Sequence, residues 1–109
     1  MIDAGTIIEN NYALKADSFL YYLQERRLFH KDALKQLCES IYAVAEENVH
    51  IARTAGEINY IYGAILKCFL YHFDADDPYK ITNMPENYNR MIRQLEKCVK
   101  FYFDTRVSA

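Results

Sequence analysis

Apolar residues recur at three- and four-residue spacing along almost the whole chain, and this period constrains the fold more than any other feature. An α-helix turns by about 100° per residue, so residues with this spacing share one face. Of the 109 residues only three are Gly and two are Pro, too few for the many turns of a β-sandwich or barrel. Since 51% of the residues are hydrophobic, the chain can bury a core without cross-links. We therefore predict an all-α fold in a single domain over residues 1–109.

One short segment divides this periodic pattern. In Thr54-Ala55-Gly56-Glu57, a Thr is followed three residues later by a Glu, the pattern of a capping box at a helix start. Gly56 lies where one helix would end and the next begin. The sequence thus predicts helices over residues 3–27, 31–53, 55–73 and 85–104, with a reversal at 54–56. Because the first two joints are short, we expect an antiparallel up-down-up-down four-helix bundle.

Each predicted helix has one apolar face, which we assign to the core. The assigned residues are Ile8, Tyr12, Ala16, Phe19, Leu20 and Leu23 in the first helix; Leu34, Leu37, Cys38, Ile41, Ala45, Asn48 and Ala52 in the second; Ile58, Ile61, Tyr62, Ile65, Phe69 and Phe73 in the third; and Tyr88, Met91, Ile92, Leu95, Cys98, Val99 and Tyr102 in the fourth. The loop over residues 74–83 exceeds the usual bundle connection, which makes it a candidate for a functional role.

Charge and cysteine content bear on the compartment. A net charge of −2 provides no global field that would draw the chain onto nucleic acid or an anionic membrane. The three cysteines, Cys38, Cys68 and Cys98, form no C-x-x-C pair, so we expect buried free thiols in a reducing compartment. The N-terminal residues show no secretory signal, and no apolar stretch approaches the ~20 residues that span a bilayer. We expect a soluble, cytoplasmic protein with no membrane partner.

Two faces remain apolar after the core has been assigned. The third predicted helix carries Tyr60, Ala64, Lys67 and Tyr71 opposite its core face, and the first carries Ile7, Leu14 and Tyr21 at seven-residue spacing. Seven-residue apolar spacing suits a second helix packed alongside. Tyr is enriched in the cores of interfaces because it adds rigid contact area at low entropy cost. We therefore predict that both faces bind a protein partner or a second copy of the chain.

The fourth predicted helix has a basic row opposite its apolar face. The row consists of Arg90, Arg93, Lys97 and Lys100. Such a row can contact an anionic partner, but it is more typical of a solvated helix face. No Gly-rich or aromatic-rich segment accompanies it, so we do not expect nucleic-acid binding.

His50 supports an alternative function. The stretch His50-Ile51-Ala52-Arg53-Thr54-Ala55-Gly56 resembles the motif of histidine phosphotransfer domains, which are acidic four-helix bundles of similar length. The resemblance implies that His50 is the phosphorylated residue and Arg53 the neighbouring cation. Judged by spacing alone, His50 belongs to an i, i+4, i+7 row with Glu46 and Arg53, the pattern of a solvated helix face.

Other candidate chemistry is sparse. Glu47-x-x-His50 has the spacing of a di-iron bundle ligand pair, but it occurs once where two copies are needed. The acidic loop of Asp74, Asp76 and Asp77 lacks the Gly and Glu of a calcium loop, and His30 and His72 suit structural or solvated roles. We predict no cofactor and no metal. The sequence favours a non-catalytic interaction module, such as an inhibitor, immunity-type or adaptor protein; phosphotransfer and a ligand- or metal-binding bundle are the alternatives.

Overall fold

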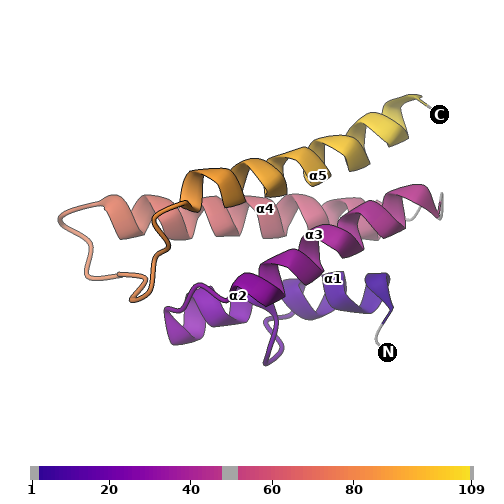
Figure 1. Cartoon of the computed structure of the whole chain (residues 1–109). Helices are drawn as coiled ribbons and strands as arrows, with labels where there is room; N and C mark the ends of the chain where they lie inside the picture. The colour runs from indigo at the N-terminus through magenta and orange to yellow at the C-terminus, as the bar shows by residue number, and fades with distance from the viewer. Residues whose placement is uncertain (1–2, 48–51, 109) are drawn as a thin grey trace.

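The computed structural model describes residues 3–47 and 52–108, except for the side chains of 106–108. Regular structure in this part of the chain is entirely helical, without a strand, which confirms the predicted all-α class. The elements are α1 (Ala4–Tyr12), α2 (Phe19–Tyr21), the π-helical η1 (Tyr22–Arg26), α3 (Lys31–Glu46), α4 (Ala52–Phe73) and α5 (Tyr88–Ser108). In Figure 1, α4 and α5 run along the length of the molecule and are joined at one end by the long loop.

The helices do not pack in sequence order. Helix α3 packs mainly against α5 and α1, whereas α4 packs mainly against α1. Among the described helices, the consecutive pair α3 and α4 shares no extensive contact. An up-down-up-down bundle built from consecutive neighbours would bring that pair together, so the predicted four-helix arrangement is not confirmed.

The first predicted helix, residues 3–27, is divided, and the break is fixed by two polar side chains. Ser18 caps α2 by accepting a hydrogen bond from Tyr21 N and donates to the Lys15 carbonyl. Asn11 is buried and bridges the two halves: its Oδ1 accepts from Leu20 N and its Nδ2 donates to the Ile7 carbonyl, each at 3.0 Å. The chain between them adopts left-handed φ values of 55° at Leu14 and 75° at Asp17.

Packing explains why the break is favourable. On an uninterrupted helix Leu14 would lie about 240° around the axis from Ile8, away from the core. In the structure Leu14 packs against the core, while Ile8 and Phe19 on either side of the break are fully buried. The segment between them, Ala13-Leu14-Lys15-Ala16, consists of good helix formers, so tertiary contacts override its local preference here.

The predicted reversal at 54–56 is wrong. Helix α3 ends at Glu46, seven residues short of its predicted end at 53, and α4 already includes Ala52, so Thr54, Gly56 and Glu57 lie inside α4. A capping-box pattern is also compatible with a helix interior, and an interior Gly costs only about 1 kcal/mol. Burial of Ile58 just downstream outweighs that cost. Of the residues assigned to the core, Asn48 lies outside the described residues.

Inside α4, Glu57 is a buried carboxyl, and its burial leads to a testable prediction. Burial raises its pKa, as does Glu9, while Arg53, with its Nε 3.9 Å from Glu57 Oε2, opposes the shift. A pKa raised by folding means that Glu57 stabilises the fold most below its unfolded pKa of about 4.3. That contribution is lost as the pH rises through the folded pKa. We therefore expect Glu57→Gln to raise the urea midpoint at pH 7 and to have little effect below about pH 4.

The control for this prediction is Glu96→Gln, because Glu96 is exposed on α5. It should leave the midpoint unchanged at both pH values. A lower midpoint for Glu57→Gln at pH 7 would show that the ion pair with Arg53 outweighs the cost of burying the carboxylate.

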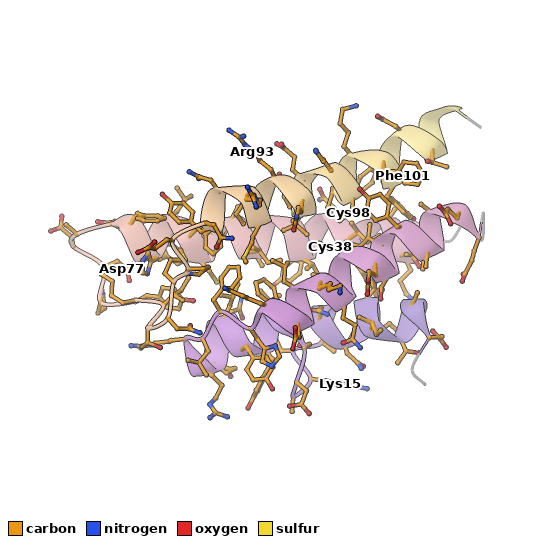
Figure 2. All side chains as sticks on the ribbon, in the orientation of Figure 1. Lys15, Cys38, Asp77, Arg93, Cys98 and Phe101 are labelled. Carbon is orange, nitrogen blue, oxygen red and sulfur yellow. The ribbon has the colours of Figure 1, made fainter. Side chains whose placement is uncertain are left out.

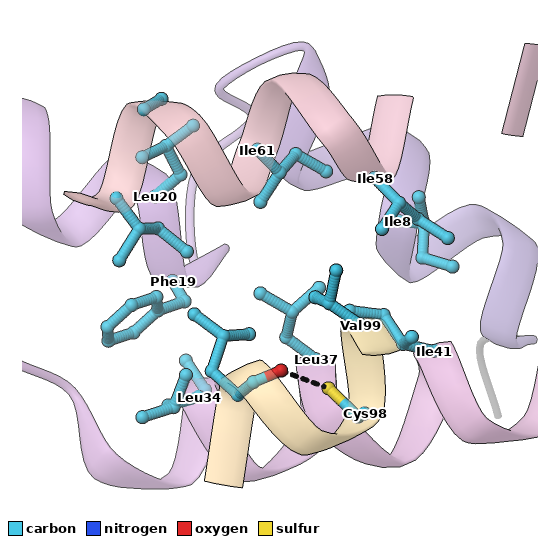
Figure 3. Close-up of a cluster of buried hydrophobic side chains, with 14 of the residues drawn as sticks. Ile8, Phe19, Leu20, Leu34, Leu37, Ile41, Ile58, Ile61, Cys98 and Val99 are labelled. Carbon is cyan, nitrogen blue, oxygen red and sulfur yellow. Dashed lines mark hydrogen bonds between the residues drawn. The ribbon is translucent and has the colours of Figure 1, made fainter. Parts of the chain in front are cut away.

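One hydrophobic core joins all the helices, and Figure 3 shows its centre. Most of the predicted core residues are buried or pack against it, but Tyr12, Ala16, Ala52 and Phe73 are exposed and their assignment is wrong. Tyr12 and Ala16 lie at the break in the first helix, and Ala52 and Phe73 at the two ends of α4. Conversely, Phe29 and Ile81 belong to the core although both lie in connecting segments.

The loop between α4 and α5 is anchored to the segment before α3. Asn83 Oδ1 accepts from Phe29 N at 2.6 Å, and Asn83 Nδ2 donates to the Phe29 carbonyl at 3.1 Å. The Thr82 amide donates to the Arg27 carbonyl. The loop is therefore a structural brace, and these anchors explain its length better than the functional role suggested by the sequence.

Two further contacts tie the same loop to the helices. The Tyr79 hydroxyl donates to the Leu23 carbonyl of η1 at 2.6 Å, and His72 Nδ1 accepts from Ile81 N at 2.9 Å. Burial, with a contribution from Lys80, lowers the pKa of His72, which favours the neutral imidazole that this acceptor role requires. Helix α5 begins at Tyr88 rather than 85, after a turn closed by a hydrogen bond from Tyr88 N to the Pro85 carbonyl.

Candidate protein-interaction surface

The face of α4 that the sequence singled out lies on the surface of the molecule. Tyr60 and Tyr71 are 53% and 46% exposed, and Lys67 is exposed between them. Ala64 is buried, because it lies at the base of this face rather than on its rim. The prediction that these four residues share one face follows from the continuous helix; that they contact a partner stays a prediction.

These residues border a shallow hollow of about 380 Å³. Its lining consists of Gln24, Asn59, Tyr60, Gly63, Ala64, Lys67, Cys68 and Tyr71. A Cβ built at Gly63 would meet nothing within 4 Å, so the space above that residue is open. The hollow therefore has a floor of small residues, tyrosines at both ends along α4 and one full charge, that of Lys67.

Two large side chains extend this surface, and sequence reasoning missed both. Tyr12 of α1 packs edge-to-face on Tyr60 with ring centroids 5.3 Å apart, and Leu70 is 70% exposed. Leu70 lies about 80° around the helix from Tyr60, so an outer face defined over a wider arc of the helix would have included it. Tyr12 depends on the position of α1 against α4 and had no signal in the sequence. We call Tyr12, Tyr60, Gly63, Ala64, Lys67, Leu70 and Tyr71 the α4 outer face.

The second predicted face does not lie on one helix. Ile7 is in α1, Leu14 is in the turn after it and Tyr21 ends α2, so the break in the chain removes their seven-residue register. All three are half-buried, and Leu14 packs against the core. The premise of a continuous heptad stripe was wrong, and the predicted partner contact of Ile7, Leu14 and Tyr21 remains untested.

The basic row is exposed on α5, as predicted from its spacing, and Figure 2 shows Arg93 pointing away from the body of the molecule. Arg90, Arg93 and Lys97 border an open depression of about 780 Å³ together with Glu86. Lys100 instead pairs with Asp104 one turn later, at 2.5 Å. An exposed ion pair of this kind contributes little to the stability of the fold. The contact of the basic row with an anionic partner stays a prediction.

His50 lies outside the described residues, so its proposed phosphorylation stays a prediction. Its predicted neighbours are nevertheless separated: Glu46 ends α3 and Arg53 belongs to α4, so they do not form one row on a single helix. Arg53 Nη2 instead contacts Glu9 Oε1 of α1 at 3.1 Å. His50 of the Glu47-x-x-His50 pair likewise lies outside the described residues, so the metal-ligand interpretation of that pair stays untested.

The other two histidines have structural roles. His30 caps α3, its Nδ1 accepting from Ala33 N at 3.0 Å, and its ring stacks on Tyr22 with centroids 4.4 Å apart. His72 accepts from the loop, as described above. Over residues 3–47 and 52–105, no group of three or more His, Cys, Asp or Glu side chains is arranged to hold a metal ion. In the described part of the chain, no helix combines the length and apolar character needed to cross a membrane.

Comparison with known proteins finds no match to this chain among protein-family models, curated proteins or solved structures.

Proposed function

We propose that the protein is a non-catalytic protein-interaction module whose docking surface is the α4 outer face. The observation that carries this proposal is the pair of half-exposed tyrosines, Tyr60 and Tyr71, at the ends of an open hollow floored by Gly63 and Ala64. Large rigid side chains around a small-residue floor offer a knob-and-hole surface to an incoming helix, and Tyr is enriched at such contacts.

A second copy of the chain is the occupant that fits this surface best. The midpoint between Tyr60 and Tyr71 along α4 falls between Ile65 and Leu66. Ala64 and Lys67 are symmetric about the same midpoint. Two α4 helices packed antiparallel about a twofold axis would therefore place each Tyr60 opposite Tyr71 of the second copy.

The same symmetry accommodates Lys67, which carries the one full charge on the α4 outer face. Lys67 of one copy would lie opposite Ala64 of the other, so its stem packs on a small apolar residue while its ammonium reaches solvent. A twofold contact of this kind uses the same patch on both copies, as most homodimers do. If the occupant were instead a different protein, as it would be for an inhibitor, immunity-type or adaptor protein, that partner would need a surface complementary to the α4 outer face.

The test is the molar mass of Tyr60→Asp/Tyr71→Asp, measured by light scattering after size exclusion. We expect the wild-type chain to be a dimer and the double variant a monomer with unchanged helical circular dichroism, since carboxylates buried in the contact would lose their solvation by water. Tyr42→Asp is the matched control, because Tyr42 is a 37% exposed tyrosine on α3 and should leave the mass unchanged.

A second variant separates association from folding. Gly63→Arg replaces a helix-interior Gly, which should stabilise the helix by about 0.5–1 kcal/mol, while its side chain fills the hollow. We expect a more stable monomer. A wild-type chain that is monomeric at all concentrations would exclude the second copy as occupant, and a double variant that remains dimeric would exclude this face.

A further inference from the structure

Two of the three cysteines meet across the interface between α3 and α5. Cys38 of α3 and Cys98 of α5 lie on facing helices, and their side chains interact. Figure 2 shows both in the layer between the two helices. Cys68, by contrast, is on α4 and its thiol interacts with Tyr79 and Gln24. The chain therefore holds one thiol pair and one separate thiol.

The two members of the pair differ in access. Cys98 is fully buried, and its Sγ lies 3.1 Å from the Leu95 carbonyl, as the dashed line in Figure 3 shows. Cys38 is half-buried and lines an open groove of about 490 Å³ between α3 and α5, together with Leu34, Met91, Lys35 and Lys97. A small reagent in this groove therefore meets Cys38, whereas Cys98 is fully buried and does not line the groove.

The contact between the thiols also makes them chemically unequal. The interaction with Cys98 lowers the pKa of Cys38, against the opposing effects of burial and Glu39. The same contact and burial raise the pKa of Cys98. Cys98 has one thiol proton and two acceptors, the Leu95 carbonyl and the Cys38 sulfur. Once Cys38 is a thiolate, the negative sulfur is the stronger acceptor, and the proton is donated to it.

We propose that Cys38 and Cys98 form a peroxide-sensitive dithiol, in which Cys38 is the attacking thiol and Cys98 the resolving thiol. This assignment does not depend on the α4 outer face. The site takes a small hydroperoxide as its oxidant, and the product is an intramolecular disulfide that joins α3 to α5.

The chemistry proceeds in two steps. The Cys38 thiolate attacks one peroxide oxygen, so that an S–O bond forms, the O–O bond breaks and the departing oxygen takes up the proton that Cys38 released, leaving a sulfenic acid and an alcohol or water. The Cys98 sulfur then attacks the Cys38 sulfur. The S–S bond forms, the S–O bond breaks, and the hydroxyl leaves with the Cys98 proton as water. Both sulfurs are oxidised and the peroxide is reduced.

The test uses the reduced full-length chain, treated with hydrogen peroxide, alkylated and digested with trypsin. The three cysteines fall into three different tryptic peptides, because Lys35 precedes Cys38, Lys67 precedes Cys68, and Lys97 and Lys100 bracket Cys98. We expect an intact mass lower by two hydrogens, a linked Cys38–Cys98 peptide pair and a free, alkylated Cys68.

Three variants separate this outcome from nonspecific oxidation. Cys68→Ser should form the same link as the wild type, Cys98→Ser should accumulate a sulfenic acid at Cys38 that dimedone traps, and Cys38→Ser should resist mild peroxide. Oxidation of wild-type Cys38 to sulfinic or sulfonic acid without a link would overturn the proposal. A link involving Cys68, or three cysteines that remain equally reduced, would overturn it as well, and these wild-type readouts hold even if a variant fails to fold.

Discussion

Phe29→Ala is expected to lower the free energy of unfolding by about 3–5 kcal/mol, the range for a buried Phe truncated in a core. Phe29 is 3% exposed although it lies in the short joint before α3. Its ring packs edge-to-face on Phe19, with centroids 5.3 Å apart, and stacks on Phe69 at 6.1 Å. It thus links α2 to α4. Urea unfolding followed by circular dichroism measures the loss.

The backbone pairing of Phe29 with Asn83 survives the substitution, because it uses only the amide and carbonyl of residue 29. The loss therefore reports side-chain packing. Leu28→Ala is the control, since Leu28 is only half-buried in the same joint and should cost clearly less. A Phe29→Ala loss as small as that of Leu28→Ala would mean that the aromatic cluster does not hold the joint in place.

Asn11→Ala is expected to cost about 1–3 kcal/mol, the penalty for leaving a buried donor without its partner, together with a smaller loss of packing. Asn11 is 1% exposed, and its amide group is the bridge between α1 and α2. Removing it leaves the Leu20 N–H unpaired in the core. We expect a lower urea midpoint and faster hydrogen exchange of the Leu20 amide, measured by nuclear magnetic resonance.

The neighbouring Asn10 provides the control. It is only partly buried, so Asn10→Ala should change stability by no more than the roughly 0.5 kcal/mol of a surface substitution. Asn11→Asp keeps the acceptor for Leu20 N but brings a carboxylate into the core, and it should destabilise at neutral pH more than at acid pH. Unchanged exchange at Leu20 in Asn11→Ala would show that the break is held by Ser18 alone.

The helical period explains which parts of the fold could be predicted. Residues such as Leu34, Leu37 and Ile41 repeat regularly within one helix, and all three are buried where the pattern placed them. The start of α3 at Lys31 and the end of α4 at Phe73 match the predicted bounds, because a short joint and a polar loop mark them in the sequence. The exposed tyrosines of α4 were predictable for the same reason, as residues left over once the core face of one helix is assigned.

The sequence by itself determined an all-helical chain, most of its core and the shared face of Tyr60, Ala64, Lys67 and Tyr71 on α4, because each of these follows from spacing within one segment. Only the tertiary structure decided the break after α1, the burial of Phe29 and Ile81, the pairing of Tyr12 with Tyr60 and the meeting of Cys38 with Cys98. These features join residues from different segments, and helical period carries no information about which segments meet. Asn11 shows the physical reason most directly: its two hydrogen bonds exist only once the helix has been broken, and they then help to stabilise the break.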